Sequence, residues 1–328
     1  MADIAPAPAD AAAIEVAGRR LWDDLRRAVG RAVVGGDETV RLVTIALLAD
    51  GHVLLEDVPG TGKTLLARAI ARALDLATAR IQGTPDLLPG DVTGASLFEP
   101  TGLRFVQGPV FTNILLVDEV NRATPRTQSA LLEAMQERQV SIEGNTHRLP
   151  DPFVVLATQN PVEFEGTFAL PQAQLDRFLL RARIGYPDDA GERRIARRHQ
   201  DAADPLDTIE PVIDRSRLLA VRDRVRTVRV ADEVESYVVA VVRATREHRD
   251  IDLGGSPRAT VALYRAAQAA AVLAGRDFVT PDDVKGVAGP VLAHRLVVDL
   301  DRSLHGATAD GVVGSILAAV PVPPVVEG

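Results

Sequence analysis

The chain has 328 residues, of which 46% are hydrophobic and 25% are charged, so we expect about two globular domains and exclude a disordered protein. It contains no cysteine, which excludes disulfide bonds, a thiolate nucleophile and a cysteine-ligated metal, and which favours the cytoplasm. A formal net charge of −8 and an aromatic content of 4% make nucleic acid an improbable partner.

The chain begins with an arm rich in alanine and proline over residues 1–13, which lacks the basic segment of a signal peptide. An amphipathic helix is predicted over residues 14–29, with Leu21, Leu25 and Val29 on one face. No stretch reaches the roughly 18 apolar residues that a membrane span needs. We therefore expect no membrane-spanning segment.

Short apolar runs of strand length then alternate with helical patterns up to residue 187. We predict strands at 52–55, near Ile81, and at 114–117, 153–158 and 178–184, with helices at 63–74 and 126–137. This alternation is typical of an α/β fold whose parallel sheet is covered by helices on both faces. Two hairpins are expected to project from the sheet, one pairing 95–98 with 103–106 and one pairing 140–142 with 146–149.

Beyond residue 187 the strand patterns fade and helical patterns take over. The expected helices lie at 190–199, 216–224, 231–248, 258–274 and 281–298. We therefore predict two domains, an αβα core over residues 1–187 and an all-helical domain over residues 188–328.

The first motif with a chemical meaning connects the strand at 52–55 to the helix at 63–74. Its residues are Pro59, Gly60, Thr61, Gly62, Lys63, Thr64 and Leu65. A phosphate-binding loop requires this context, because its glycines let backbone N–H groups face an anion, its lysine supplies charge to the β- and γ-phosphates, and its threonine offers a hydroxyl to Mg²⁺. Asp57 stands where the pattern has its first glycine. The alternative reading is a glycine-rich turn before a helix.

Two carboxylates, Asp118 and Glu119, follow the apolar strand at 114–117, at the end where open parallel sheets bind ligands. We expect Asp118 to hold Mg²⁺ through water and Glu119 to polarise an attacking water; the alternative is a solvated acidic turn. Asn160 ends the next strand and can hydrogen-bond both a γ-phosphate and that water, although an asparagine before Pro161 is also a common turn residue. The chain has no N-K-x-D guanine-recognition motif, so the pattern favours ATP.

In combination these motifs resemble those of the MoxR-type AAA+ ATPases. The runs VPGTGKT, ILLVDEVNRATPRTQSALLEAMQE, ATQNP, LPQAQLDRF and GGSPRA occur in that order, and the resemblance covers residues 33–298. It implies an αβα P-loop core, a helical lid, and a ring of six subunits that binds ATP and Mg²⁺. It also implies chaperone-like remodelling of protein clients, among them proteins with von Willebrand factor A domains.

The resemblance further assigns single residues. It places Asn160 at the sensor 1 position, Arg177 at the position of an arginine finger that reaches the γ-phosphate of a neighbouring subunit, and Arg258 at sensor 2 on the lid. Val34 and Gly35 correspond to a contact beside the adenine. From the residues alone, Arg177 can instead pair with an acidic neighbour such as Asp176, and Arg258 can simply lie in the first turn of a helix.

Two further functions stay open at this point. One is a DNA-associated motor, because helicases share such hairpins, and the other is a scaffold that binds ATP without hydrolysing it. The six histidines show no metal-ligand spacing, and the arginines between 193 and 198 have the pattern of a solvated helix face or of a contact between lid and core.

Overall fold

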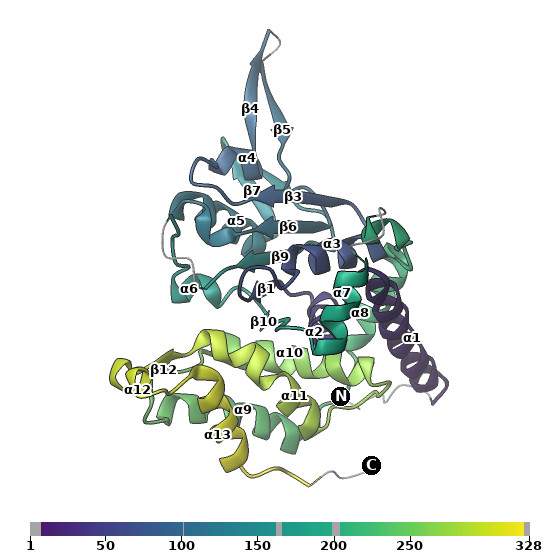
Figure 1. Cartoon of the computed structure of the whole chain (residues 1–328), viewed down its shortest axis with the longest axis vertical. Helices are drawn as coiled ribbons and strands as arrows, with labels where there is room; N and C mark the ends of the chain where they lie inside the picture. The colour runs from purple at the N-terminus through teal and green to yellow at the C-terminus, as the bar shows by residue number, and fades with distance from the viewer. Residues whose placement is uncertain (1–7, 101, 162–165, 199–203, 325–328) are drawn as a thin grey trace.

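The computed structural model describes residues 8–100, 102–161, 166–198 and 204–324. Figure 1 shows an α/β core that carries a projecting hairpin, with a helical lid beneath it. The core contains a five-stranded sheet in the order β10-β1-β9-β6-β3, and its four neighbouring pairs all run parallel. The predicted parallel α/β fold with a helical lid is confirmed.

The strands of this sheet are short, with three to six residues each. They are β1 (Val53–Glu56), β3 (Thr78–Gln82), β6 (Ile114–Asp118), β9 (Val154–Gln159) and β10 (Leu180–Ala182). Side chains alternate between the two faces of a strand, so neighbours in sequence enter different parts of the core. Leu55 packs in one hydrophobic cluster and Leu54 in another on the opposite face. Burial on both faces explains why the central strands β1, β9 and β6 read as nearly unbroken apolar runs, whereas the edge strand β3 alternates polar and apolar residues.

Helices also contribute residues to each cluster. The first cluster contains residues of α1 (Pro8–Ala32), α2 (Asp37–Leu48) and α3 (Lys63–Ala73), and the second contains residues of α5 (Pro125–Glu137). The helix α2 was not predicted. Nine of its twelve residues are buried, so it is apolar around most of its circumference and lacks the one-sided stripe that marks a surface helix.

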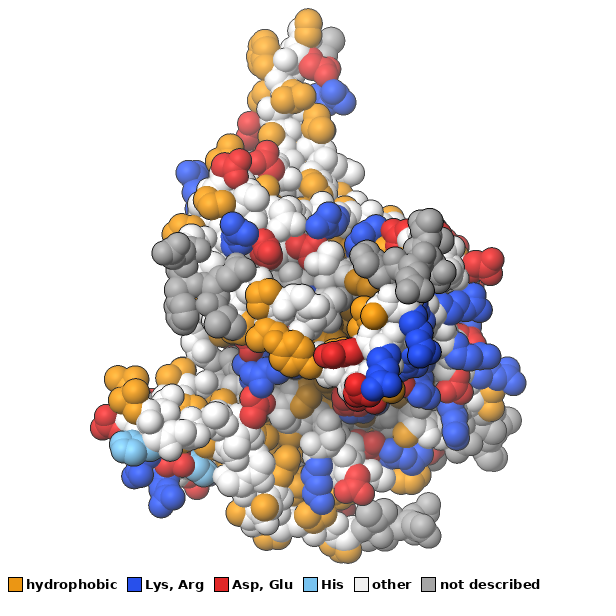
Figure 2. Space-filling view, in the orientation of Figure 1, with side chains coloured by type: hydrophobic (Ala, Val, Ile, Leu, Met, Phe, Trp, Pro, Cys, Tyr) orange, Lys and Arg blue, Asp and Glu red, His pale blue; other side chains and the backbone are white. Residues whose placement is uncertain are grey.

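Both predicted hairpins are confirmed as antiparallel pairs. The first joins β4 (Gly94–Glu99) to β5 (Gly102–Gln107) after the short helix α4 (Pro89–Thr93), and the second joins β7 (Gln139–Ile142) to β8 (Asn145–Arg148). The β4–β5 hairpin extends away from the core, and Figure 2 shows hydrophobic side chains gathered along it. Phe98 near its tip is 86% exposed.

After residue 187 the chain packs against the core again before it enters the lid. The segment contains α7 (Asp189–Arg198), the turn η2 (Pro205–Thr208), β11 (Ile213–Asp214) and α8 (Arg215–Val225). β11 pairs in parallel with β2 (Leu74–Asp75), which directly follows α3. Arg198 Nη1 also donates to the carbonyl of Ala32 at the end of α1, at 2.9 Å. The domain boundary at residue 187 stays a prediction.

The lid consists mainly of helices. They are α9 (Asp232–Glu247), α10 (Pro257–Leu273), α11 (Pro281–Leu292), α12 (Leu300–Leu304) and α13 (Ala309–Ala319). The helix expected over 281–298 ends at Leu292, where the turn η3 (Ala293–Arg295) directs two polar side chains toward the core. The strand β13 (Val297–Val298) follows that turn and pairs antiparallel with β12 (Ile251–Leu253), which lies between α9 and α10. Within the described ranges no helix is long and apolar enough to cross a membrane.

Candidate nucleotide site and arginine cleft

The loop between β1 and α3 has the geometry of a phosphate-binding loop. Gly60 and Gly62 both have φ of 85°, a left-handed conformation that glycine adopts without strain, and Gly62 is the N-cap of α3. The helix N-terminus and its free N–H groups therefore open onto the loop. Lys63 Nζ donates to the carbonyls of Asp57 (2.6 Å) and Val58 (2.8 Å) and to Asn160 Oδ1 (2.7 Å). The structure thus brings Lys63 and Asn160 together.

Asp57, the departure from the glycine pattern, uses its carboxylate to tie the loop to a distant segment. Its Oδ1 accepts from the N–H of Val58 at 2.8 Å, and its Oδ2 accepts from the N–H groups of Ile184 (2.9 Å) and Gly185 (2.6 Å). Asp57 is not among the residues with positive φ, so its backbone does not need the freedom of a glycine. The side chain therefore fixes the start of the loop against the segment that follows β10.

Asp118 lies beside Thr64, as a shared magnesium site requires. Thr64 Oγ1 donates to Asp118 Oδ1 at 2.9 Å, and Thr158 Oγ1 reaches the same oxygen at 3.3 Å. Arg80 Nε pairs with the other oxygen, Oδ2, at 2.7 Å. Hydroxyl and carboxylate oxygens are the hard ligands that Mg²⁺ prefers. No cluster of three or more His, Asp or Glu side chains able to hold a metal occurs among the described residues.

Glu119 follows Asp118 in a left-handed backbone conformation, with φ 53° and ψ 52°. Its N–H donates to Thr158 Oγ1 at 2.9 Å, which fixes the backbone to β9. Its Oε2 accepts from Gln82 Nε2 (3.0 Å) and from Arg122 Nη1 (3.1 Å) in the turn η1 (Val120–Arg122). An unusual backbone conformation held from several sides is common at catalytic positions.

Four of these partners were not singled out in the sequence: Arg80, Gln82, Arg122 and Thr158. The signal that was available is their position. Arg80 and Gln82 lie two residues apart on β3, so their side chains point to the same face of the sheet. Because β3 is the neighbour of β6, this places them beside the two carboxylates.

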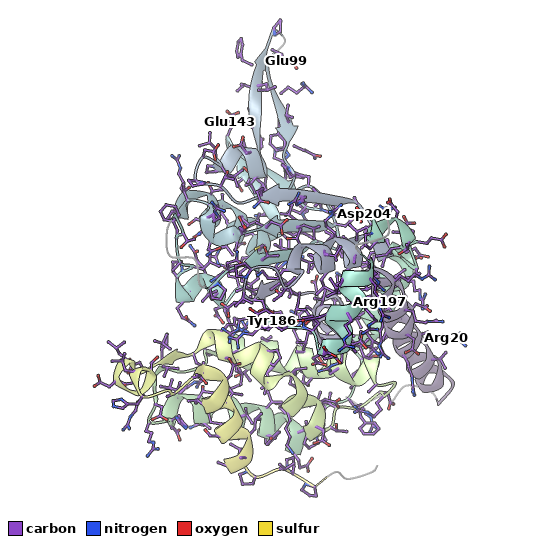
Figure 3. All side chains as sticks on the ribbon, in the orientation of Figure 1. Arg20, Glu99, Glu143, Tyr186, Arg197 and Asp204 are labelled. Carbon is purple, nitrogen blue, oxygen red and sulfur yellow. The ribbon has the colours of Figure 1, made fainter. Side chains whose placement is uncertain are left out.

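A cavity of about 810 Å³ opens beside the phosphate loop. It is lined by Gly60, Thr61, Gly62 and Leu65, by Val34 and Gly35 in the segment before α2, and by residues 184–188 with part of α7. The structure therefore brings Val34 and Gly35 to the loop, as expected for the base-binding end of a nucleotide. Tyr186, which the sequence analysis did not single out, also lines this cavity and is 76% exposed. Figure 3 shows it between the core and the lid.

Arg177 and Arg258 lie elsewhere. They line a second cavity, of about 300 Å³, which shares no lining residue with the first. We call it the arginine cleft; Arg138, Arg265 and Arg295 also line it, with Asp50 and Asp176. Across the described part of the chain, no ion pair forms at Arg177, Arg258 or Arg265. Asp176 pairs with Arg295 at 2.8 Å, so the local pair of Arg177 with Asp176 does not form.

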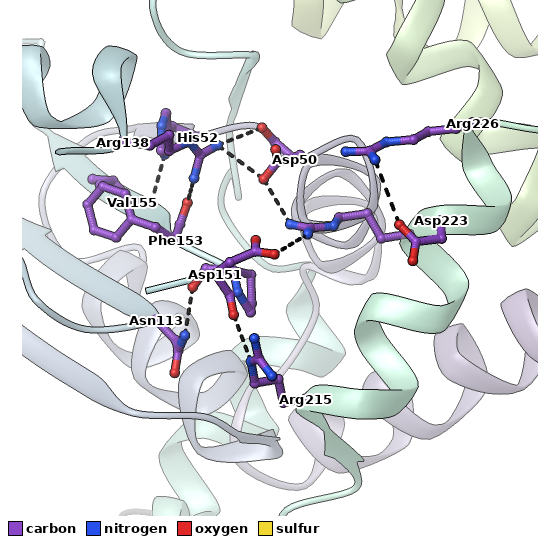
Figure 4. Close-up of polar contacts among 12 residues, drawn as sticks. Asp50, His52, Asn113, Arg138, Asp151, Phe153, Val155, Arg215, Asp223 and Arg226 are labelled. Atoms are coloured by element: carbon purple, nitrogen blue, oxygen red, sulfur yellow. Dashed lines mark hydrogen bonds and ion pairs between the residues drawn. The ribbon is translucent and has the colours of Figure 1, made fainter. Parts of the chain in front are cut away.

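A partly buried polar network lies beside this cleft and includes three of its lining residues, Asp50, His52 and Arg138 (Figure 4). Asp50 Oδ1 accepts from Arg138 Nη2 and Arg222 Nη1, both at 3.1 Å, and Arg222 also pairs with Asp151 at 2.8 Å. His52 beside it bonds to the carbonyl of Met135 and accepts from the N–H of Val155, both at 3.0 Å. Burial, with a smaller effect of the Arg138 charge, lowers the pKa of His52 to about 3, so its imidazole is neutral.

The comparisons with known proteins agree with this geometry. Residues 52–180 match a family model described as "ATPase family associated with various cellular activities (AAA)", and residues 243–313 match the "AAA lid domain". The chain is 47% identical to YeaC, an uncharacterised protein of Bacillus subtilis, over 90% of this chain and 92% of that protein. It is 41% identical to chaperone MoxR1 of Mycobacterium tuberculosis, over 90% of this chain and 81% of that one.

A crystal structure from Cytophaga hutchinsonii, described as a candidate ATPase, superposes with a TM-score of 0.87 at 36% identity and covers 96% of this chain and 99% of its own. A parallel P-loop core with a C-terminal lid defines an ATPase of the AAA class. The chain belongs to the MoxR-type AAA+ ATPases.

Proposed function

We propose that this chain binds ATP with Mg²⁺ and hydrolyses it, and that each active site is completed by a second copy of the chain. The observation that carries the proposal is the separation of two half-sites. The phosphate loop and the carboxylates meet at one edge of the sheet, while Arg177 and Arg258 line a cleft that has no lining residue in common with the loop cavity.

The first half-site contains the groups that water attack on a phosphoryl group needs. Lys63 and the N–H groups of the loop offset the charge of the β- and γ-phosphates. Thr64 and Asp118, which lie in contact, would hold Mg²⁺, and a bound Mg²⁺ would supply further charge neutralisation at the phosphates. Glu119 accepts a proton from the attacking water, and Asn160, held beside Lys63, orients that water. Glu119 first has to exchange its contacts with Gln82 and Arg122 for the water.

The second half-site supplies positive charge. The guanidinium groups of Arg177 and Arg258 face one cleft without ion-pair partners among the described residues, and they come from the core and the lid respectively. Their placement supports a role on the nucleotide of a neighbouring chain, for Arg258 as well as for Arg177. Head-to-tail contacts of this kind close into a ring, for which we propose six subunits.

The work that hydrolysis drives is, in this proposal, chaperone-like remodelling of partner proteins, including proteins with von Willebrand factor A domains. The support for the chaperone-like role is the name of a relative, a chaperone from Mycobacterium tuberculosis, whereas the clients with von Willebrand factor A domains rest on the sequence resemblance alone. Glu119→Gln keeps the shape of the site and removes the base, so it should retain ATP and hold its client. Co-purification of a protein by Glu119→Gln but not by Lys63→Ala would support this part; equal recovery with both variants would contradict it.

Mixing two inactive variants tests the shared site. Arg177→Ala and Glu119→Gln should each bind ATP and scarcely hydrolyse it, because an arginine supplied in trans contributes about 10³- to 10⁵-fold to the rate. In a random mixture of equal amounts of the two variants, about a quarter of the interfaces join an intact Glu119 to an intact Arg177, and turnover should recover to that extent. If subunits exchange and no mixing ratio restores phosphate release, the site is not shared.

A further inference from the structure

Arg295, in the lid, holds the backbone on both sides of Arg177. Its side chain is almost fully buried and reaches from η3 into the core. Nε donates to Asp176 Oδ1 (2.8 Å), Nη2 donates to the carbonyls of Asp176 (3.3 Å) and Phe178 (2.6 Å), and Nη1 donates to the carbonyl of Leu179 (2.9 Å). Each of the three guanidinium nitrogens therefore binds the segment 176–179, in which Arg177 is the second residue.

Two neighbours strengthen this contact, His294 from the lid and Gln172 from the core. His294 Nε2 lies 3.2 Å from the carbonyl of Phe178, and Gln172 Nε2, in α6 (Gln172–Leu175), donates to the carbonyl of His294 at 2.8 Å. Burial, and then the charge of Arg295, lowers the pKa of His294 well below its ordinary value. The neutral ring adds no charge beside the guanidinium, and we call Arg295, Asp176 and His294 the clamp.

The clamp also touches the helix that carries Arg258. Ser256 Oγ donates to the second oxygen of Asp176, Oδ2, at 3.4 Å. Ser256 is the N-cap of α10, and its hydroxyl accepts from the N–H of Arg258 at 3.2 Å. One carboxylate therefore lies between the segment that presents Arg177 and the helix end that presents Arg258.

These contacts favour a rigid backbone at Arg177 and leave the end of its side chain without a partner among the described residues. A buried guanidinium is tolerated only when its charge is paired and its N–H groups are bonded, and here burial lowers the pKa of Arg295 while Asp176 raises it. Removal of either partner, Arg295 or Asp176, would therefore loosen the whole segment 176–179. Arg177 itself has no ion pair within the described ranges, and its Nε is buried without a hydrogen-bond partner, so its direction depends on the backbone that the clamp holds.

We infer that Arg295 is a positioning residue for Arg177: it holds the finger in the direction that meets the nucleotide of the neighbouring chain, and it makes that direction follow the lid. This inference rests on the proposed function. A misplacement of about 1 Å in a catalytic group lowers rates by about 100-fold, so a clamp of this kind controls hydrolysis in the next subunit without touching ATP.

Kinetics give the first test. Arg295→Lys keeps the charge but cannot span the three carbonyls, so kcat should fall by about 100-fold while KM for ATP changes less than about twofold. The matched control is Arg276→Lys. It breaks a bidentate ion pair with Asp283, in which both contacts are 2.6 Å, and this pair lies within the lid. It should keep the wild-type rate. A wild-type rate for Arg295→Lys, or a loss that appears mainly in KM, overturns the inference.

Mixing gives the second test, because a variant of a residue that positions Arg177 must be complemented by the same partner variants as Arg177→Ala. Arg295→Lys mixed with Glu119→Gln should recover turnover as Arg177→Ala mixed with Glu119→Gln does, whereas Arg295→Lys mixed with Arg177→Ala should show no gain. If Arg295→Lys does not fold, Asp176→Asn removes the same pair and should give the same pattern.

The outcomes separate the two proposals. Failure of the mixture of Arg177→Ala with Glu119→Gln overturns the shared site itself. Success of that mixture, combined with failure of Arg295→Lys to complement Glu119→Gln, overturns only the positioning role. A gain from Arg295→Lys with Arg177→Ala has the same consequence, because it would show that the two residues act in different half-sites.

Discussion

The carboxylate of Asp57 satisfies three backbone N–H groups, two of them in the segment that lines the nucleotide cavity. Asp57→Gly restores the usual phosphate-loop residue and removes this tie. We expect it to lower the free energy of unfolding by about 2 kcal/mol, because hydrogen bonds to a charged group are lost and glycine favours the unfolded chain. ATP should also bind more weakly, since residues 184 and 185 are released from the loop. Urea unfolding and equilibrium binding of an ATP analogue measure the two effects.

Asp57→Asn is the matched control, because its amide oxygen can still accept from Ile184 and Gly185. It should lose less stability and less affinity than Asp57→Gly. Wild-type values for the glycine variant would show that the carboxylate does not hold the loop.

The neutral, buried imidazole of His52 makes stability depend on pH. Its pKa is about 3 in the folded chain, against an ordinary value near 6.5, so between these values the unfolded chain binds one more proton. Stability is therefore lost as the pH falls below 6.5, by about 2 kcal/mol at pH 5 from this one group. Unfolding in urea between pH 7.5 and 5 measures the slope, and His52→Gln, which does not titrate, should reduce it. An equal slope in both proteins would contradict the assignment.

At the scale of elements, the end of β3 packs directly against the end of β6, where Glu119 lies. A Cβ on Gly83 would lie 2.1 Å from the carbonyl oxygen of Glu119, closer than any real contact. Gly83→Ala should therefore push Glu119 out of place and lower phosphate release by at least about 10-fold, with ATP binding retained. In Gly90→Ala the new methyl meets only Ala95 at 3.9 Å, so this control should keep its activity. Wild-type turnover in Gly83→Ala would show that the strand end tolerates movement.

Elements with a strong local pattern could be predicted, and those that depend on their surroundings could not. The sheet strands and both hairpins carry their own apolar runs and turns, and the structure confirms them. The helix α2 lacks a polar face because helices and sheet surround it. The end of α11 at Leu292 depends on bonds that His294 and Arg295 make with the core, and no pattern within residues 281–298 indicates them.

The same distinction holds within the site. The phosphate loop and the two carboxylates lie in short contiguous motifs, so residue type and spacing were enough. Arg80 meets Asp118 across 38 residues and Arg295 meets Asp176 across 119, and only the folded chain joins them. The sequence also could not show that Arg177 and Arg258 share a cleft apart from the loop cavity, since one comes from the core and the other from the lid.

At the scale of the whole molecule, the proposed function gives a single copy two incomplete half-sites. We expect ATP turnover per chain to fall on dilution, while ATP binding per chain stays constant, because only hydrolysis needs a neighbour. Phosphate release and molecular mass measured over the same range of concentrations test this. Full turnover at concentrations where the protein is monomeric would contradict the two-half arrangement.

The unpaired arginines of the cleft also have a consequence for unfinished assemblies. With the shared site proposed above, an open row of n chains would contain n − 1 complete sites, and one terminal molecule would present its arginine cleft, with Arg177 and Arg258, to solvent. Closure of the row removes that exposed charge. A polyanion such as heparin should therefore bind the terminal molecule of an open row, slow ring closure in a salt-dependent manner, and leave rings that have already closed unaffected.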